Sequence, residues 1–155
     1  MKHRFAQMTC ANKRAIICVN LCFICGLEMG TGVMSFEHKE VTEAIIGAAF
    51  EVHKILGHGF LENVYQNAVQ VELIQRGHRC QTESPIKVRY KNVIVGEYRA
   101  DLLVDEVVVV ELKVAKTYQS ADESQLLNEL KATGIRVGLL INFGREKVEF
   151  KRMVF

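Results

Sequence analysis

The chain has 155 residues, of which 49% are hydrophobic and 25% are charged, and its formal net charge is +2. This length supports one domain with a buried core, and the composition excludes a disordered or low-complexity chain. The small net charge argues against a protein that binds nucleic acid over its whole surface, although a local basic groove is compatible with it.

The first 34 residues differ from the rest of the chain. Four basic residues precede the apolar run AIICVNLCFICGL at 15–27, and four of the five cysteines lie in this segment. The run has the length of a signal-peptide core and is shorter than the roughly 20 residues that span a bilayer. We predict that residues 1–34 are an N-terminal extension from a mis-chosen start codon. A signal peptide or membrane anchor within residues 1–27 is the alternative.

Three of these cysteines, Cys18, Cys22 and Cys25, have the C-x3-C-x2-C spacing that holds an iron–sulfur cluster in radical-SAM enzymes. Such enzymes need a long α/β barrel after the motif, and the chain that follows is too short and differently ordered. We therefore interpret these cysteines as small hydrophobic residues within an apolar run. Without a signal peptide, the lone Cys80 fits a reducing, cytoplasmic location.

A chain that begins at Met34 is expected to fold, because helical periodicity starts abruptly after Ser35 while charge and cysteine content change there. It should be soluble and show one cooperative thermal transition. Loss of folding in the shortened chain would contradict this prediction.

Two helices are predicted before any strand. Ser35 is a plausible N-cap, with Glu37 and Glu40 in the first turn. Apolar residues recur at helical spacing at Val41, Ala44, Ile45, Ala48, Val52 and Ile55, until LGHG at 56–59 ends the helix. A second helix is predicted from Phe60 to Arg76, closed by Gly77.

The second helix has two apolar stripes. The main predicted stripe comprises Leu61, Val64, Ala68 and Val71, and a narrower one comprises Tyr65, Val69 and Leu73. A helix with two apolar sides should be buried on both. Glu62 lies within the narrower stripe, so we expect it to face a cleft or the sheet.

Strands and one more helix make up the remainder. Strands are predicted at Ile86–Tyr90, Val93–Val104 and Val107–Val114, with a tight turn at Lys91-Asn92. A capping box at Ser120 and Glu123 opens a third helix that ends at Gly134, and two strands follow at 136–143 and 147–155. The order α-α-β-β-β-α-β-β predicts an α/β protein of the α+β type, with a mixed sheet flanked by helices.

Charged residues interrupt the strands in RADLLVDEVVVVELKVAK, residues 99–116. Asp101, Glu111 and Lys113 lie among apolar residues, where an unpaired charge costs several kcal/mol or shifts its pKa. Glu111 and Lys113 are two apart on a strand and share a face. Converging carboxylates beside a lysine suit Mg²⁺ or Mn²⁺, which can activate water for phosphodiester hydrolysis. A structural ion pair at a strand end is the alternative interpretation.

The connection between the two acidic strands decides whether the acids can meet. A two-residue turn at Asp105-Glu106 would pair Asp101 with Val110 and point Asp101 away from Glu111. A shared metal site therefore requires a three-residue connection, Asp105 to Val107, or a β-bulge in either strand.

The stretch GFLENVY at 59–65 reads G-x-x-E-x-x-Y, and residues 36–155 resemble the GxxExxY protein family of the PD-(D/E)XK nuclease-like superfamily. Further blocks that resemble the family are ELIQRG at 72–77, VGEYRADLLV at 95–104, VVVVELK at 107–113, QLLNELKATG at 125–134 and GLLINFG at 138–144. The resemblance implies a restriction-endonuclease-like core of α-β-β-β-α-β order in residues 35–155.

The resemblance also implies roles for individual residues. Asp101 and Glu111 would be metal ligands and Lys113 the lysine of the E-x-K element. Glu62 would orient the metal or its water, and Gln125 matches the glutamine of the Q-x-x-x-Y element of RecB-like nucleases.

The chain departs from these patterns at two positions. Glu129 occupies the tyrosine position of the Q-x-x-x-Y element, which puts nucleic-acid contact at that helix in doubt. Ala100 stands where the superfamily pattern has proline, and this affects no ligand. Gly59 and Tyr65, although part of the family motif, are also explained as a helix-start glycine and a packed aromatic residue.

We therefore predict a Mg²⁺-dependent (or Mn²⁺-dependent) nuclease whose partner is nucleic acid of unspecified type. The complete set of Asp101, Glu111 and Lys113 favours this function. A non-catalytic nucleic-acid- or protein-binding module that retains the fold is the alternative, and the near-neutral charge of residues 35–155 favours it slightly. A membrane-tethered protein that uses residues 15–27 is a third option.

Overall fold

The computed structural model describes residues 37–155. The predictions for residues 1–34 and for Ser35 as an N-cap lie outside the described residues. The described chain forms one five-stranded mixed sheet with three helices, and the elements follow the predicted order. They are α1 (Lys39–Leu56), α2 (Glu62–Gln75), β1 (Cys80–Tyr90), β2 (Val93–Val104), β3 (Val108–Lys113), α3 (Ser120–Thr133), β4 (Val137–Asn142) and β5 (Glu149–Val154).

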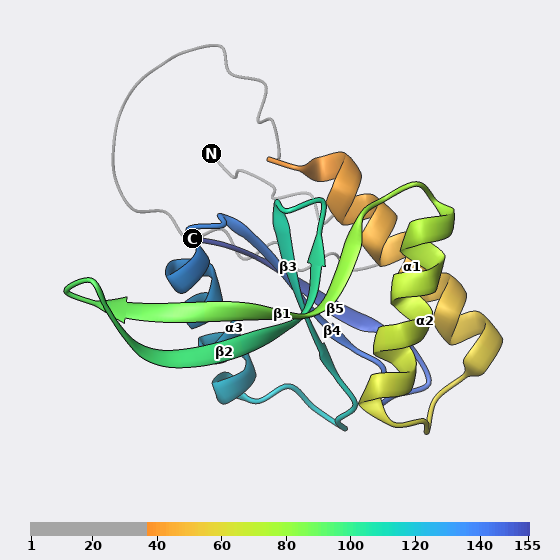
Figure 1. The fold of residues 1–155 in the computed structure, drawn as a ribbon. Helices are drawn as coiled ribbons and strands as arrows, with labels where there is room; N and C mark the ends of the chain where they lie inside the picture. Colours follow the sequence, from red (N-terminus) through yellow and green to blue (C-terminus); the bar gives the residue numbers. More distant parts are fainter. Residues whose placement is uncertain (1–36) are drawn as a thin grey trace, which may run out of the picture. The chain divides into compact units, whose positions relative to one another are not determined.

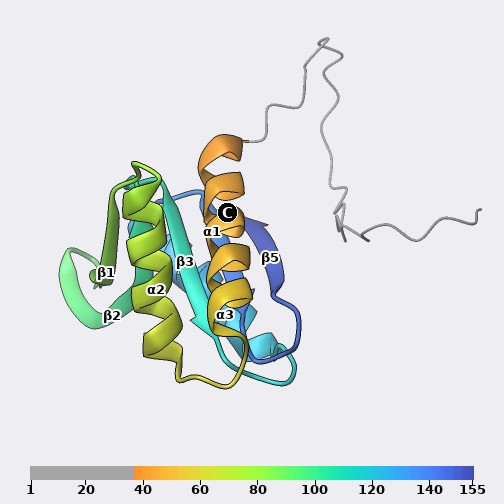
Figure 2. The same ribbon diagram turned by 90° about the vertical axis from the view of Figure 1, so that its right-hand side faces the viewer.

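The sheet has the strand order β1-β2-β3-β4-β5, and only β3 and β4 are parallel. Helix α3 makes the crossover between these two strands and covers one face of the sheet, whereas α1 and α2 cover the other (Figure 1). Figure 2 shows α1 and α2 side by side in front of the strands, with α3 behind them. Strands β3 and β4 are therefore covered on both faces and are apolar almost throughout, as central strands are. The predicted α+β fold is confirmed.

Helix α1 begins later than the sequence indicated. Its N-cap is His38, in a left-handed conformation with φ 54°, and the helix starts at Lys39. Glu40 lies in the first turn as expected, but Glu37 precedes the helix and forms an ion pair with Arg136 at 3.3 Å. The left-handed conformation of His38 and the ion pair of Glu37 with Arg136 mark this boundary. Helix propensity predicts neither feature.

Helix α2 buries the narrower of its two apolar stripes. Tyr65, Val69 and Leu73 are fully buried, whereas Leu61 and Val71 of the stripe predicted as the main one are 74% and 53% exposed. The prediction of a helix buried on two sides is therefore wrong. The helix packs one face on α1 and the sheet. That face carries the large aromatic ring of Tyr65, although the other stripe has more apolar residues. The C-terminus is as predicted: Gly77 has φ 88°, and His78 N–H donates to the Leu73 carbonyl at 3.0 Å.

Helix α3 ends at Gly134 as predicted, but its cap is shifted by one residue. The N-cap is Gln119, whose N–H donates to the Asp122 carboxylate at 2.9 Å. Glu123, expected in the capping box, instead forms an ion pair with Lys151 of β5 at 2.6 Å. The residue types at 119–123 permit either frame, and in the structure Asp122 caps the helix while Glu123 pairs with Lys151.

Both hairpin predictions are confirmed. Lys91 and Asn92 have φ of 46° and 67° and join Tyr90 to its partner Val93, which is the geometry of a two-residue hairpin turn. Between β2 and β3, Val104 pairs with Val108, so the connection has three residues, Asp105 to Val107.

The three-residue connection is tied to the end of α2. The Asp105 carboxylate accepts a hydrogen bond from the Arg79 N–H at 2.9 Å and lies 2.7 Å from the His78 ring Nδ1. Asp105 N–H donates in turn to the Arg79 carbonyl at 2.8 Å. These bonds compensate for the left-handed backbone of Asp105 and Glu106, whose φ angles are 50° and 63°.

Replacing Gly144 with alanine is expected to lower the free energy of unfolding by about 3 kcal/mol, because its Cβ would overlap the backbone N and O of Ala115. The Asn142 side chain hydrogen-bonds the same two atoms, so this backbone has little freedom to move. Gly96→Ala is the matched control, since the nearest atom to its Cβ is 4.0 Å away. Urea unfolding should show a large loss for the first variant only; equal effects would contradict the prediction.

Within residues 37–155, no helix combines the length and hydrophobicity needed to cross a bilayer.

Candidate active site

Asp101 lies where β2 separates from β3. The backbone ladder pairs Leu102 with Val110, and its register continued by one residue places Asp101 opposite Glu111. At this point the Asp101 side chain replaces the backbone partner, because its Oδ2 accepts the Leu112 N–H at 2.7 Å. Burial raises the pKa of Asp101 and the negative charge of Glu62 adds to this, although the Leu112 hydrogen bond opposes it.

Glu111 is almost completely buried, at 1% exposure. Its Oε1 accepts hydrogen bonds from Lys113 Nζ at 2.7 Å and from Gln125 Nε2 at 2.6 Å. Its Oε2 is buried and has no hydrogen-bond partner among the described residues. Burial, and next the negative charge of Asp101, raise the pKa of Glu111 to about 8 despite the lysine beside it.

Lys113 supplies the positive charge next to these acids. It follows Glu111 by two residues on β3, so both side chains lie on the α3 face of the sheet, as the spacing predicted. Burial alone would lower the pKa of Lys113, but the hydrogen bond to Glu111 and the surrounding negative charges raise it. The raised pKa keeps the amine of Lys113 charged, and the Lys113 side chain is only 20% exposed.

Helix α3 places Gln125 and Glu129 beside Glu111. The Gln125 amide bridges two acids, donating to Glu111 at 2.6 Å and to Glu129 Oε1 at 3.1 Å. Glu129 is 1% exposed, and burial raises its pKa. The sequence marked Glu129 only as a departure from a motif. Its spacing of four residues from Gln125, which places both on one helix face, could have identified it as part of the site.

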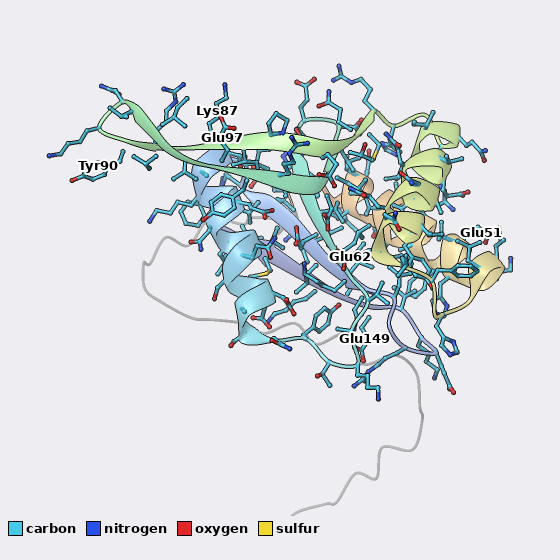
Figure 3. All side chains as sticks on the ribbon, turned by 60° about the horizontal axis from the view of Figure 1, so that its bottom comes forward. Glu51, Glu62, Lys87, Tyr90, Glu97 and Glu149 are labelled. Atoms are coloured by element: carbon cyan, nitrogen blue, oxygen red, sulfur yellow. The ribbon has the colours of Figure 1, made fainter. Side chains whose placement is uncertain are left out.

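Glu62 lies at the start of α2, and Figure 3 shows it between that helix and the strands of the sheet. Its side chain is exposed, yet its charge acts on both Asp101 and Lys113. The structure thus brings Glu62 into electrostatic range of the predicted metal ligands. Its role in orienting a metal or water stays a prediction.

Gln66, one turn after Glu62, is a site residue that sequence reasoning missed. Its amide donates to the Asp101 carbonyl at 2.8 Å and to the Glu83 carboxylate at 3.2 Å. A buried glutamine within the apolar stripe of α2 was the available signal, because a buried amide must find partners. Gln66 anchors the backbone that carries Asp101.

Gly59 and Tyr65 of the G-x-x-E-x-x-Y stretch have structural roles here. Gly59 has φ 108°, which strongly favours glycine. The Tyr65 hydroxyl donates to the Gly57 carbonyl at 2.8 Å, and its ring stacks on Phe143 with centroids 4.5 Å apart. Both residues fix the loop before α2 and thereby the position of Glu62.

The site holds carboxyl groups whose ionised forms are costly unless a cation lies beside them. Burial raises the pKa of three carboxyl groups, those of Asp101, Glu111 and Glu129, and the charge of Lys113, with hydrogen bonds from Leu112 and Gln125, only partly opposes this rise. The buried, unpartnered Oε2 of Glu111 is a hard oxygen donor of the kind Mg²⁺ and Mn²⁺ prefer. The described part of the chain holds no preformed group of three or more His, Cys, Asp or Glu ligands. The residues present therefore fit a cation held by two carboxylates, with water or substrate oxygens completing its coordination.

Two solved structures share features of this fold at low similarity. The crystal structure of SSO0001 has a TM-score of 0.43 and 16% identity, covering 76% of this chain and 59% of the other. This chain therefore spans less than two thirds of SSO0001. An alkaline exonuclease (LHK-Exo) from Laribacter hongkongensis has a TM-score of 0.41 and 11% identity, covering 73% of this chain and 81% of the exonuclease chain. No curated protein matches the sequence.

The sequence model of the PD-(D/E)XK nuclease superfamily matches residues 39–153, nearly all of the described chain. The matched range includes both candidate ligand strands and α3. The chain therefore belongs to the PD-(D/E)XK nuclease superfamily.

Proposed function

We propose that this protein hydrolyses phosphodiester bonds of nucleic acid with the help of a divalent cation, Mg²⁺ or Mn²⁺. The observation that carries the proposal is the buried, unpartnered Oε2 of Glu111, in a site that also contains Asp101 and the charged amine of Lys113. Within the superfamily, the G-x-x-E-x-x-Y stretch supports membership in the GxxExxY protein family.

Each residue has a proposed part in this reaction. Asp101 and Glu111 would hold the cation, which polarises a phosphoryl oxygen and lowers the pKa of a bound water. Lys113 would position that water and stabilise negative charge on the phosphate. Gln125 holds Glu111 in place through its 2.6 Å hydrogen bond, and Glu62 would accept a hydrogen bond from water at the exposed side of the site.

The test is cleavage of single- and double-stranded DNA and RNA with Mg²⁺ or Mn²⁺. The unchanged protein should cleave at least one substrate, and the Asp101→Ala and Lys113→Ala variants should not. Chelation with EDTA should stop the reaction. Equal cleavage by all three proteins would indicate a contaminating nuclease and refute the proposed site.

A non-catalytic binding module is the second candidate. The formal charge of −1 over residues 37–155 favours it, because a nuclease must neutralise the phosphates that it binds. Binding of nucleic acid without cleavage under every metal condition would select this alternative.

We further propose a reducing cytoplasmic location for the described domain. Cys80 is a buried free thiol, and burial followed by the negative charge of Asp105 raises its pKa to about 11. A thiol with so high a pKa is unreactive, so its presence reflects packing.

A further inference from the structure

The outer part of the β1–β2 hairpin, residues 84–100, extends away from the rest of the sheet and is called the arm (Figure 1). Most of its side chains are exposed, including large ones: Tyr90 is 63% exposed, Val93 63% and Tyr98 51%. Because these side chains contribute little to the core, packing does not account for their aromatic and apolar character.

The arm carries a charge opposite to that of the remaining described chain. It has one acidic residue, Glu97, and four basic ones, so its formal charge is +3. The basic residues are Lys87, Arg89, Lys91 and Arg99. The rest of residues 37–155 has twelve basic and sixteen acidic residues, for a formal charge of −4. A polyanion is therefore attracted to the arm in preference to the rest of this surface.

A pocket of about 290 Å³ separates the arm from α3. Tyr98 lines it from the arm, and α3 contributes Ala121, Ser124, Gln125, Asn128 and Glu129. Tyr98 pairs with Ile86, which packs in the α3-side core, so both lie on the face of the arm toward α3. Gln125 lines the pocket and also donates to Glu111, so the pocket borders the candidate active site.

The two walls of this pocket suit an unpaired nucleobase. The exposed ring of Tyr98 offers a stacking surface, and Ser124 and Asn128 offer a hydroxyl and an amide for the edge of a base. A base within a duplex is stacked on both faces and paired at its edge, so it is not available to such a pocket. Such a pocket would accept a base from a single strand and exclude a base within a duplex.

We propose that the arm and α3 bind a single-stranded segment of nucleic acid, with one base stacked on Tyr98 and its phosphates near the basic side chains of the arm. This inference rests on the proposed nuclease function and specifies its substrate class. The first turn of α3 contains Asp122 and Glu123, whose charges keep the phosphates on the arm side of the pocket.

The strand register places the basic side chains of the arm where they can reach the phosphates of a bound strand. Lys87 pairs with Glu97 and Arg99 with Pro85, so they lie on the opposite face of the arm from Tyr98. Figure 3 shows Lys87 and Glu97 close together on that face. The arm is only two strands wide, about 5 Å between strands, so long basic side chains reach its edges and contact a backbone passing over it.

The binding of a fluorescent single-stranded oligonucleotide tests the inference. Anisotropy is measured in EDTA, so that no cleavage occurs, for the unchanged protein and for Tyr98→Ala, Tyr98→Phe and Ile94→Ala. Loss of the ring should weaken binding about tenfold, whereas Tyr98→Phe should retain affinity. Ile94, 42% exposed on the face opposite Tyr98, is the control and should bind normally.

Two further binding measurements test the position of the stacked base and the contribution of the basic side chains. An oligonucleotide series with one abasic nucleotide should include a position that loses affinity with the unchanged protein and loses none with Tyr98→Ala. Replacing Lys87, Arg89 and Lys91 together with glutamine should flatten the salt dependence of binding, whereas Lys54→Gln, on α1, should not.

The inference is overturned if duplex binds more tightly than single strand, if Tyr98→Ala binds normally, or if no abasic position matters. Cleavage assays separate this failure from failure of the proposed function. If cleavage depends on Asp101 but binding does not depend on Tyr98, only the proposed single-strand site is refuted. If binding depends on Tyr98 but no cleavage occurs, only the proposed nuclease function is refuted.

Discussion

Replacing Asp101 with asparagine is expected to slow metal-dependent cleavage of nucleic acid by about a thousandfold, the scale on which removing one electrostatic stabiliser acts. Asparagine keeps the shape of the side chain, and its carbonyl oxygen can still accept the Leu112 N–H that Asp101 Oδ2 accepts at 2.7 Å. The variant should therefore retain the melting temperature of the unchanged protein while losing affinity for Mn²⁺ in calorimetric titration.

Glu83→Gln is the matched control for Asp101→Asn. The charge of Glu83 also acts on Asp101, and its side chain accepts a hydrogen bond from Gln66, but it lies on the exposed edge strand β1. If cleavage required only negative charge near the site, and not a metal ligand at position 101, both variants would lose activity. We expect the Glu83 variant to stay within about fivefold of the unchanged protein, a change of about 1 kcal/mol in the barrier. An Asp101→Asn variant that cleaves within tenfold of the unchanged protein would refute the ligand assignment.

Replacing Glu111 with glutamine is expected to stabilise the metal-free protein at pH 8 while removing its response to metal. Burial, with the charge of Asp101, raises the pKa of Glu111 from its ordinary value to about 8. Between these values the folded protein holds a proton that the unfolded chain has released, so stability falls as pH rises through this window. Below the ordinary pKa the group is protonated in both states, and above about 8 the cost is constant.

The expected size of this effect is on the order of 5 kcal/mol across the window, because one pKa unit corresponds to about 1.4 kcal/mol. In EDTA, the melting temperature of the unchanged protein should fall from pH 5 to pH 8 more steeply than that of Glu111→Gln. Addition of Mg²⁺ should raise the melting temperature of the unchanged protein at pH 8 and leave the variant unaffected. Glu97→Gln, an exposed change on the arm, should follow the unchanged protein. Parallel pH profiles for Glu111→Gln and the unchanged protein would contradict the prediction.

Local patterns determined much of this structure. The order of the elements, the turn at Lys91-Asn92 and the glycine that ends α2 followed from periodicity and turn chemistry, which act over a few residues. The three-residue connection was predictable for a different reason. Side chains alternate along a strand, so two acids can share a face in only one register, and the structure has that register.

Tertiary contacts decided which of several equally plausible local patterns the structure uses. The two apolar stripes of α2 were distinguishable only by what packs on them, and the sheet and α1 selected the one with Tyr65. Glu37 and Glu123, expected in the first turns of α1 and α3, instead form ion pairs with Arg136 and Lys151, which are distant in sequence.

For the candidate site, the sequence by itself determined that Glu111 and Lys113 share a strand face and that Asp101 can join them, because alternation along a strand is a local property. Only the tertiary structure decided that Gln125 and Glu129 close over Glu111, that Gln66 holds the backbone of Asp101, and that Glu111 is almost completely buried. Helix α3 packs on the sheet face that carries these acids and removes them from water. Desolvation by that packing, more than any property of the residues themselves, raises the pKa of Glu111 and makes its ionised form costly unless a cation lies beside it.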